Sequence, residues 1–244
     1  MQPKGNTTAV VPMEPTLAGK ATALAERLAL PLAAARSETY RFLLQVHSGG
    51  LALKDQGQPG TRALWLDPAR RRTVPSGRDL IARALGRHCC TIIDATAGFG
   101  FDAFDFAHRG KRVVAIERST VVAELLADAA PRFLSCQPNA GLSVITGDSR
   151  YLLTTLPPAD VVFLDPMFPS HQQKSARSCK AQLMLRALVG DDNDAAVLAR
   201  LARERALKRV VVKRPRHAPA LGGPPDLTHA GRAVRYDVYL AGSS

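Results

Sequence analysis

The sequence predicts an α/β fold built on a doubly wound, mostly parallel sheet, with a small α+β unit before it and an antiparallel hairpin at its end. Three observations predict this fold. From residue 91 onward, short apolar runs alternate with segments of helical periodicity, as expected for parallel strands joined by helices. Two of these runs, 91–93 and 161–164, are each followed by a loop that starts with an aspartate. The last two expected strands are separated only by Ala230-Gly231-Arg232, which is too short for a parallel crossover, so they should pair antiparallel.

The first 78 residues are expected to form a tail and a small domain. Residues 1–15 contain Pro3, Pro12 and Pro15 among small and polar residues, so we expect a flexible tail. Residues 16–78 should form a small α+β domain, because a helical Ala/Leu pattern is followed by strand-like runs. The elements expected here are a helix over 17–32, strands over 40–46 and 51–53 joined at Ser48-Gly49-Gly50, and a strand over 62–66.

Residues 79–244 are expected to form the larger domain. Its strands and helices alternate, and we see no internal repeat. The expected strands are 91–95, 112–117, 142–146, 160–165, 209–213, 227–230 and 233–240, and the expected helices are 79–85, 101–109, 119–129, 149–155, 178–188 and 193–206.

The composition indicates a folded protein that binds a polyanion. Hydrophobic residues make up 46% of the 244 residues and charged residues 22%, so a packed core is expected and global disorder is not. The 33 Lys and Arg against 21 Asp and Glu give a formal net charge of +12. A strong positive charge favours nucleic acid as the partner. A general arginine bias of the source proteome is the alternative explanation.

The cysteines predict neither a zinc site nor a disulfide framework, because no pair has the Cys-x-x-Cys spacing. We expect reduced thiols in a cytoplasmic protein. No apolar run approaches the ~18 residues of a membrane span, and no secretory signal is visible. The four cysteines are Cys89, Cys90, Cys136 and Cys179.

The loop Asp94-Ala95-Thr96-Ala97-Gly98-Phe99-Gly100 is the first candidate binding site. Gly98 and Gly100 lie where a strand turns into a helix, and glycine lets the backbone come close to a ligand. The spacing Gly98-x-Gly100-x-x-Ala103 also fits a dinucleotide fingerprint, and a simple turn is the alternative. Ligands of open α/β sheets bind at the carboxyl ends of the strands, so we expect these glycines to contact a nucleoside cofactor.

Three acidic residues at strand ends distinguish between cofactors. Glu117 ends the second strand of the larger domain, where it can accept hydrogen bonds from ribose hydroxyls, unless it is an ordinary exposed glutamate. Asp94 would repel a pyrophosphate but suits a cationic amino-acid cofactor. Asp148 follows the third strand, where it could accept from an adenine amine or cap the helix over 149–155. These acids favour S-adenosylmethionine (SAM) over NAD.

The loop Asp165-Pro166-Met167-Phe168-Pro169 is the candidate catalytic site. Asp165 could accept a hydrogen bond from an exocyclic amine and orient the nitrogen lone pair toward a methyl group. Pro166 stiffens the loop and removes a donor. Phe168 could stack on an extruded base, or it could simply cover the core. This chemistry needs no metal.

Basic residues are concentrated in loops that the predicted sheet brings to its ligand-binding edge, or at the junction of the two expected domains. Arginine and lysine in such places neutralise phosphates, although a solvated loop is the alternative. The candidate nucleic-acid-binding residues are Arg70, Arg71, Arg72, Lys174, Arg177, Lys180, Lys213, Arg214 and Arg216.

Several strings resemble one known family. They are Asp94-Ala-Thr-Ala-Gly-Phe-Gly-Phe-Asp-Ala-Phe, Ile116-Glu-Arg-Ser, Leu164-Asp-Pro-Met-Phe-Pro, Leu188-Val-Gly-Asp-Asp and Arg209-Val-Val-Val-Lys-Arg-Pro. Together they resemble the RsmJ family of bacterial 16S ribosomal RNA guanine-N2 methyltransferases, over roughly residues 62–241. The resemblance implies a class I methyltransferase with a Rossmann-like sheet. It also implies SAM contacts at Phe101, Asp102, Glu117, Arg118, Asp148, Ser149 and Asp165.

The leading hypothesis is a SAM-dependent enzyme that methylates the N2 atom of a guanine in 16S ribosomal RNA, either free or in the 30S subunit. A methyltransferase acting on DNA adenine or protein glutamine is the first alternative, because the same loop could hold any planar nitrogen. An NAD-dependent oxidoreductase and a non-catalytic RNA-binding domain are the others. Neither a metal nor a membrane partner is expected.

Overall fold

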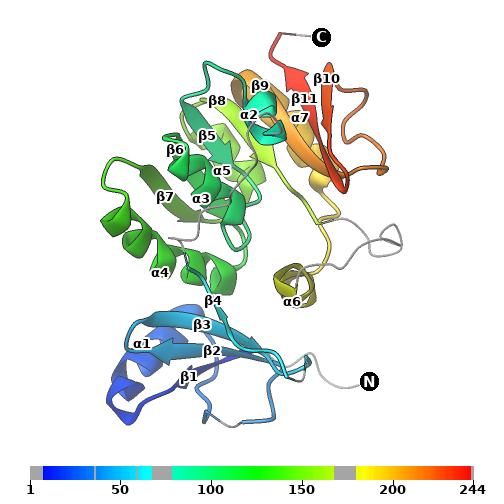
Figure 1. Ribbon diagram of the computed structural model, residues 1–244. Helices are drawn as coiled ribbons and strands as arrows, with labels where there is room; N and C mark the ends of the chain where they lie inside the picture. The colour runs from blue at the N-terminus through cyan, green and yellow to red at the C-terminus, as the bar shows by residue number, and fades with distance from the viewer. Residues whose placement is uncertain (1–7, 36, 59, 68–78, 168–179, 243–244) are drawn as a thin grey trace.

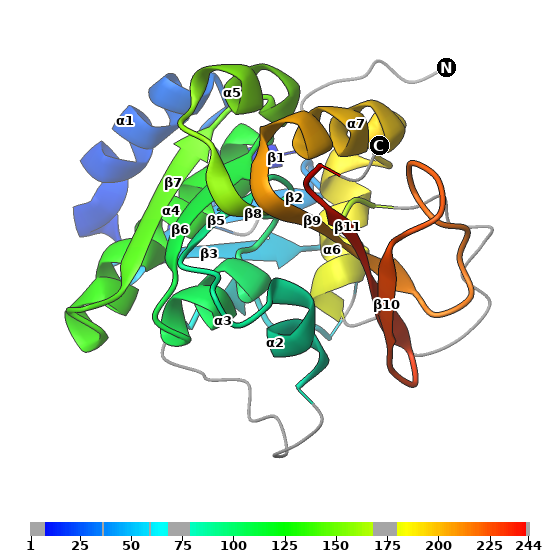
Figure 2. The same ribbon diagram turned by 90° about the horizontal axis from the view of Figure 1, so that it is seen from above.

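The computed structural model describes residues 8–35, 37–58, 60–67, 79–167 and 180–242. In these ranges the chain forms a four-stranded sheet and a seven-stranded sheet, with the long helix α4 (Thr120–Cys136) between them (Figure 1). Helices cover both faces of the larger sheet (Figure 2). The predicted α/β class is therefore confirmed.

The larger sheet has the strand order β10-β11-β9-β8-β5-β6-β7. Strands β5 to β9 are parallel, and β11 pairs antiparallel with both β9 and β10, so the expected C-terminal hairpin is present. The strand order changes direction at β5, because β6 lies on one side of it and β8 on the other. Such a switch point opens a crevice at the carboxyl ends of the strands. The strands are β5 (Thr91–Asp94), β6 (Arg112–Glu117), β7 (Gly141–Thr146), β8 (Ala159–Leu164), β9 (Ala206–Pro215), β10 (Leu227–Ala230) and β11 (Val234–Leu240).

Successive side chains of the parallel strands point to opposite faces of the sheet, so alternate residues pack into two separate cores. In β8, Phe163 belongs to the core under the first set of helices, where it lies edge-on to Phe106 at 4.9 Å between ring centroids. Leu164, the next residue, belongs to the core on the opposite face. The first face is covered by α2 (Leu80–Leu85), α3 (Phe101–His108), α4 and α6 (Lys180–Val189), and the second by α5 (Ser149–Thr155) and α7 (Ala195–Arg205).

The smaller sheet has the order β1-β2-β3-β4 and packs against helix α1. The hairpin expected at Ser48-Gly49-Gly50 is present, because β2 and β3 pair antiparallel across it. Helix α1 is shorter than expected, since it ends at Ala29, whose φ of 51° is left-handed. The elements are β1 (Thr8–Pro12), a 3-10 turn (Pro15–Leu17), α1 (Ala18–Leu28), β2 (Phe42–His47), β3 (Gly50–Asp55) and β4 (Leu64–Trp65).

The prediction of a flexible tail over residues 1–15 is wrong for Thr8–Pro12, which forms β1. This strand pairs in parallel with β2, and Ala9, Val10 and Val11 are fully buried. Three small apolar residues between prolines resemble linker sequence, but a parallel partner 34 residues later in the chain supplies the hydrogen bonds that stabilise them. The expected boundary at residue 78 lies outside the described residues, so the division into domains stays a prediction.

Helix α4 connects the two sheets through polar contacts as well as apolar packing. The Asp128 carboxylate accepts a hydrogen bond of 3.0 Å from the backbone N–H of Leu51 in β3. The Arg132 guanidinium donates to the carbonyl of Leu66 and lies over the Trp65 ring, 5.1 Å from its centroid. The small sheet therefore shares its core with the larger unit rather than standing alone.

The helix expected over 119–129 continues to Cys136, although Pro131 lies inside it. Proline removes one helical hydrogen bond and usually costs about 3 kcal/mol in a helix interior. Burial of Phe133 against Phe104 and His108 offsets this cost, because a fully buried aromatic side chain contributes a similar amount. Packing therefore overrides the local sequence signal here.

Candidate active site at the carboxyl edge of the larger sheet

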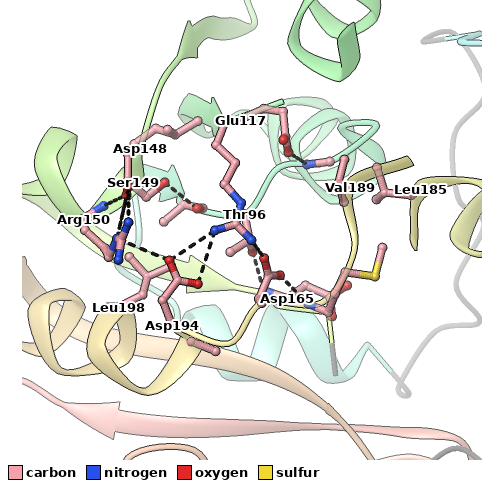
Figure 3. A pocket seen from close by; sticks show the side chains of 17 residues that line it. Thr96, Glu117, Asp148, Ser149, Arg150, Asp165, Leu185, Val189, Asp194 and Leu198 are labelled. Carbon is pink, nitrogen blue, oxygen red and sulfur yellow. Dashed lines mark hydrogen bonds and ion pairs between the residues drawn. The ribbon is translucent and has the colours of Figure 1, made fainter. Parts of the chain in front are cut away.

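Loops that lie far apart in the sequence meet where β5, β6 and β8 end. Strand β5 pairs with β6 on one side and with β8 on the other, so the loops that begin after Asp94, Glu117 and Leu164 are neighbours. They surround a pocket that α5, α6 and α7 close from the sides (Figure 3). The pocket is lined by Ala95, Thr96, Gly98, Ile116, Glu117, Arg118, Asp148, Ser149, Arg150, Asp165, Met167, Leu185, Val189, Asp192, Asp194, Ala195 and Leu198.

The glycine turn after β5 is fixed by Glu117. Gly98 and Gly100 have φ angles of 52° and 77°, which favour glycine. A Cβ atom at Gly98 would lie 2.9 Å from a methyl group of Leu185, so a side chain here would also force Leu185 to move. One oxygen of Glu117 accepts a hydrogen bond of 2.8 Å from the Gly98 N–H, and the other accepts one of 2.7 Å from the Ser119 N–H.

Glu117 is positioned to accept further hydrogen bonds from a ligand. Its side chain is buried at the end of β6, and burial raises its pKa, against the lowering effect of the two backbone hydrogen bonds. A carboxylate oxygen has two lone pairs, so each oxygen of Glu117 can accept a second hydrogen bond. This supports the prediction that Glu117 binds ribose hydroxyls.

Asp148 and Ser149 line the same pocket from the start of α5. Asp148 accepts a hydrogen bond from the Arg150 N–H as the N-cap of this helix, so the capping role is present. The Arg150 guanidinium also pairs with the Asp148 carboxylate and lowers its pKa. Ser149 donates a hydrogen bond of 2.6 Å from its hydroxyl to the carbonyl of Ala95, which joins α5 to the loop after β5. Capping and binding are compatible, and the role of Asp148 toward an adenine amine stays a prediction.

Two further carboxylates, those of Asp192 and Asp194 in the α6–α7 connection, line the pocket. They are not among the site residues predicted from the sequence. Asp192 and Asp194 both pair with the Arg118 guanidinium, and Asp194 also pairs with Arg150 at 3.3 Å. Figure 3 shows Asp148, Arg150 and Asp194 grouped on one side of the pocket. The signal in the sequence was the string Leu188-Val-Gly-Asp-Asp, which is acidic in a basic protein.

Asp165 lines the pocket from the end of β8, and its loop is held from two sides. Its backbone N–H donates a hydrogen bond of 2.6 Å to the hydroxyl of Thr96. Two residues on, the Met167 N–H donates to the Asp192 carboxylate at 2.6 Å, and the Met167 carbonyl accepts from the Asp192 N–H. Pro166 is buried between these anchors. Phe168 lies outside the described residues, so its stacking role stays a prediction.

Four of the predicted cofactor residues do not line the pocket. They are Asp94, Gly100, Phe101 and Asp102. Asp94 is 1% exposed, and burial together with the nearby Asp102 and Asp165 carboxylates raises its pKa well above the ordinary range. Phe101 is half exposed at the first position of α3. Their contribution to cofactor binding stays a prediction and would be indirect for Asp94.

Two of the predicted phosphate contacts need correction. The Lys213 ammonium lies between two carboxylates, 2.6 Å from an oxygen of Asp102 and 2.7 Å from an oxygen of Asp165, so it is not a surface cation. Arg214 is 4% exposed and donates two hydrogen bonds to the carbonyl of Pro219. Strand β9 is longer than expected and continues to Pro215, so Lys213 and Arg214 lie within the sheet, on its two opposite and covered faces, and not in an exposed loop.

The remaining basic candidates are exposed or lie outside the described residues. Lys180 is exposed at the start of α6. Arg216 is exposed and donates a hydrogen bond of 2.7 Å to the carbonyl of Gly231 in the hairpin turn. The others, Arg70, Arg71, Arg72, Lys174 and Arg177, lie outside the described residues.

The charges of the pocket lining fit SAM better than a dinucleotide. The lining has five carboxylates against two guanidinium groups, although the whole chain carries a formal charge of +12. SAM carries a sulfonium and an ammonium group, which this lining attracts, whereas it would repel a pyrophosphate. The five carboxylates are those of Glu117, Asp148, Asp165, Asp192 and Asp194.

No group of three or more His, Cys, Asp or Glu side chains among the described residues is arranged to hold a metal ion. No helix in the described ranges combines the length and the apolar character needed to cross a membrane.

Comparison with known proteins identifies the family. Residues 23–241 match the model of the SAM_MT family of SAM-dependent methyltransferases. The chain is 40% identical to a protein from Coxiella burnetii named ribosomal RNA small subunit methyltransferase J, over 96% of this chain and 97% of that protein. A protein of the same name from Dechloromonas aromatica is 39% identical over 93% and 97% of the two chains.

A solved structure supports the same family. The crystal structure of a SAM-dependent methyltransferase from Neisseria gonorrhoeae superposes with a TM-score of 0.74 at 30% identity, and covers 97% of each chain. The predicted class I methyltransferase sheet is therefore confirmed. The interpretations as an NAD-dependent oxidoreductase and as a non-catalytic RNA-binding domain are wrong. The chain belongs to the family of SAM-dependent methyltransferases whose curated members are named ribosomal RNA small subunit methyltransferase J, and its cofactor is S-adenosylmethionine.

Proposed function

We propose that this chain transfers a methyl group from SAM to the exocyclic N2 atom of a guanine in small-subunit ribosomal RNA. The observation that carries the proposal is that Asp165 and Glu117, from the loops after β8 and β6, line one pocket. The two curated relatives described above are named as methyltransferases of this RNA. The guanine N2 acceptor follows from the resemblance of the Asp165-Pro166-Met167-Phe168-Pro169 loop to the RsmJ family.

The cofactor side of the pocket would be formed by Glu117 and Asp148. Bound SAM supplies a methyl group on a positively charged sulfur atom. Glu117 accepts hydrogen bonds from the ribose hydroxyls, because its carboxylate is fixed by Gly98 and Ser119 and each oxygen has a second lone pair. Asp148 accepts from the adenine amine, which requires Arg150 to release part of its ion pair with Asp148.

The acceptor side would be formed by Asp165. The guanine N2 amine donates a hydrogen bond to this carboxylate, which orients its lone pair toward the methyl group. Positive charge builds on the nitrogen as the new C–N bond forms, and a fixed negative group beside it lowers the barrier. The methyl–sulfur bond of SAM would break as the C–N bond forms, leaving a neutral thioether, and the nitrogen would then release one proton to water, so the methylated amine leaves neutral. Positioning and electrostatics therefore account for the role of this chain.

RNA would be bound by exposed cations near this edge of the sheet. The target guanine would be extruded from its helix to reach Asp165, because base pairing hides its N2 atom. Lys180 and Arg216 are the described candidates, and Arg70, Arg71, Arg72, Lys174 and Arg177 complete the proposed set. The formal charge of +12 supports a nucleic acid over a protein acceptor. We place the enzyme in the cytoplasm, where ribosomal subunits are assembled.

The proposed acceptor is tested by offering labelled SAM and the purified protein four substrates: free 16S RNA without its native modifications, 30S particles from the same source, duplex DNA and a mixture of ribosomal proteins. We expect label in the RNA, released as N2-methylguanosine on digestion and identified by mass spectrometry. Preference for free RNA or for particles shows when in assembly the enzyme acts. Label in N6-methyladenine or in glutamine would establish the alternative acceptor and overturn the proposal.

A further inference from the structure

We propose that Lys213 is a positioning residue for methyl transfer, which holds the Asp165 carboxylate and ties its loop to the start of α3. The proposal rests on the proposed function, since it assigns Asp165 the role of orienting the acceptor amine. It replaces the interpretation of Lys213 as a phosphate contact.

The register of the larger sheet brings the groups together. Strands β5, β8 and β9 are adjacent and parallel, with Asp94 level with Phe163 and Leu164 level with Val212. Asp94 and Lys213 within β5 and β9, and Asp165 directly after β8, each lie two positions after a side chain of the core on the α3 face, namely Ile92, Val211 and Phe163. Side chains two residues apart lie on one face of a strand. Asp94, Asp165 and Lys213 therefore converge on the α3 face at the carboxyl edge.

Asp102 reaches the same point from helix α3. It is the second residue of this helix, and one of its oxygens lies 2.6 Å from the Lys213 ammonium. An oxygen of Asp165 lies 2.7 Å from the same ammonium. One cation therefore joins the glycine turn, which leads into α3, to the catalytic loop after β8. Charge-assisted hydrogen bonds of this length are among the strongest in proteins.

Burial strengthens the attraction between the Lys213 ammonium and the carboxylates. The Lys213 side chain is 14% exposed and the Asp102 side chain 13%, so solvent screens this pair only weakly, whereas the Asp165 side chain is 31% exposed. Without the ammonium, Asp94, Asp102 and Asp165 would lose the cation that lies between Asp102 and Asp165. The Lys213 ammonium offsets part of the negative charge of the Asp102 and Asp165 carboxylates, and Asp165 still faces the pocket in which positive charge develops.

Lys213 is a cation in this arrangement and not a proton acceptor. Desolvation alone would lower its pKa, but the two carboxylates outweigh desolvation and raise the pKa above that of an ordinary lysine. A general base would need a neutral amine near pH 7. The contact with Asp165 instead sets the rotation of the carboxylate plane, and so the direction of the remaining lone pairs toward the acceptor amine.

The test compares Lys213→Met and Lys213→Arg with Lys208→Met. Lys208 is a matched control, because it lies in the same strand and pairs with Asp160 at 2.8 Å at the far end of the sheet. For each folded protein, the SAM dissociation constant is measured by calorimetry, and kcat and the RNA KM are measured between pH 5 and 9.

For Lys213→Met we expect kcat to fall about 100-fold, since small misplacement of a reacting group costs about this much. The SAM dissociation constant and the RNA KM should stay within about threefold. The acidic limb of the kcat profile should move to higher pH by about one unit or more, because Asp165 loses a cation at 2.7 Å. In Lys213→Arg the acidic limb should stay at the parental pH, and kcat should fall by less than in Lys213→Met. In Lys208→Met both kcat and the position of the acidic limb should match those of the parent.

Parental kcat and pH profile in Lys213→Met would overturn the proposal. A raised RNA KM with unchanged kcat would do the same and would restore the phosphate contact. If Lys213→Met does not fold, Lys213→Arg provides the test. A kcat of Lys213→Arg equal to that of the parent would show that the geometry of the contact with Asp165 is unimportant, and would overturn the proposal.

A titration of Asp165 by carboxylate NMR separates this proposal from the proposed function. In Lys213→Met the Asp165 carboxylate should bind a proton at higher pH than in the parent, whichever acceptor the enzyme methylates. An unchanged titration would contradict the positioning role. Absence of transfer to RNA by the parent would contradict only the acceptor assignment.

Discussion

The Glu117 carboxylate accepts a hydrogen bond of 2.8 Å from the backbone N–H of Gly98. This single contact joins the end of β6 to the left-handed turn after β5, 19 residues earlier in the chain. The residue expected to bind the ribose therefore also shapes the glycine turn beside it. Loss of Glu117 should affect both the cofactor and the turn.

Replacement of Glu117 should weaken SAM binding. Glu117→Ala removes the ribose acceptor and leaves the Gly98 and Ser119 N–H groups without their partner, so we expect the SAM dissociation constant to rise about 100-fold, or about 2.7 kcal/mol. Glu117→Gln keeps one acceptor oxygen, so its SAM dissociation constant should rise only about tenfold. Calorimetry on the purified variants measures both. Unchanged affinity in Glu117→Ala would remove this residue from the cofactor site.

Asp192 should matter for turnover more than for cofactor affinity. Asp192→Ala releases the Met167 N–H, which now donates to its carboxylate at 2.6 Å, and so loosens the loop that carries Asp165. We expect kcat to fall about 10- to 100-fold. Asp191→Ala is the matched control, because Asp191 pairs with Arg186 of α6 and should keep kcat within about threefold. Equal kcat values for the two variants would show that the loop is held by other contacts.

Arg216 should contribute to RNA binding through charge. Arg216→Glu should weaken binding and reduce the slope of log affinity against log salt concentration by about one, since each neutralised phosphate contributes roughly that amount. Arg200→Glu, on the exposed surface of α7, makes the same change in net charge and should keep the parental slope. Filter binding at several salt concentrations gives the slopes. Identical slopes in both variants would place Arg216 off the RNA path.

Asp160 should make folding stability depend on pH. Burial alone would raise its pKa, but hydrogen bonds from Lys208 and from the Cys90 and Thr91 N–H groups lower the pKa to about 2. Because the folded-state pKa lies below the ordinary value of 3.8, the stabilisation is complete above about pH 4 and is lost as pH falls toward 2. Asp160→Ala should lower the free energy of unfolding by about 2 kcal/mol at pH 7. The difference from the parent should narrow below pH 4 in urea titrations, and a constant difference would contradict this linkage.

Strand–helix alternation was enough to predict the larger sheet, because its strands are buried runs bounded by glycine, proline or acidic residues. The approximate positions of β5, β6 and β8 follow from this pattern, and with them the meeting of Glu117 and Asp165. Strand β1 was missed, because its three-residue apolar core is stabilised by a partner that is distant in the sequence. Helix α4 was expected to stop before Pro131, because tertiary packing of Phe133 has no local signal.

The candidate site was predictable at strand ends and less so elsewhere. Lys213 looks like the start of a basic loop in the sequence, but the length of β9 turns it toward Asp102 and Asp165. Asp192 lies in a connection between helices, where the sequence alone does not say which loop it faces. Both residues act through contacts between segments far apart in the chain.

We propose that the loop after β5 and Glu117 hold the cofactor, whereas Asp165 orients the acceptor amine. The most direct test measures Asp165→Asn twice on the same preparation: SAM binding by calorimetry, and single-turnover methyl transfer to unmodified 16S RNA. We predict a SAM dissociation constant within about tenfold of the parent's, or about 1.4 kcal/mol, and loss of most N2-methylguanosine formation. Parental transfer by this variant, or loss of SAM binding sufficient to explain the lost transfer, would contradict the division of roles between the two loops.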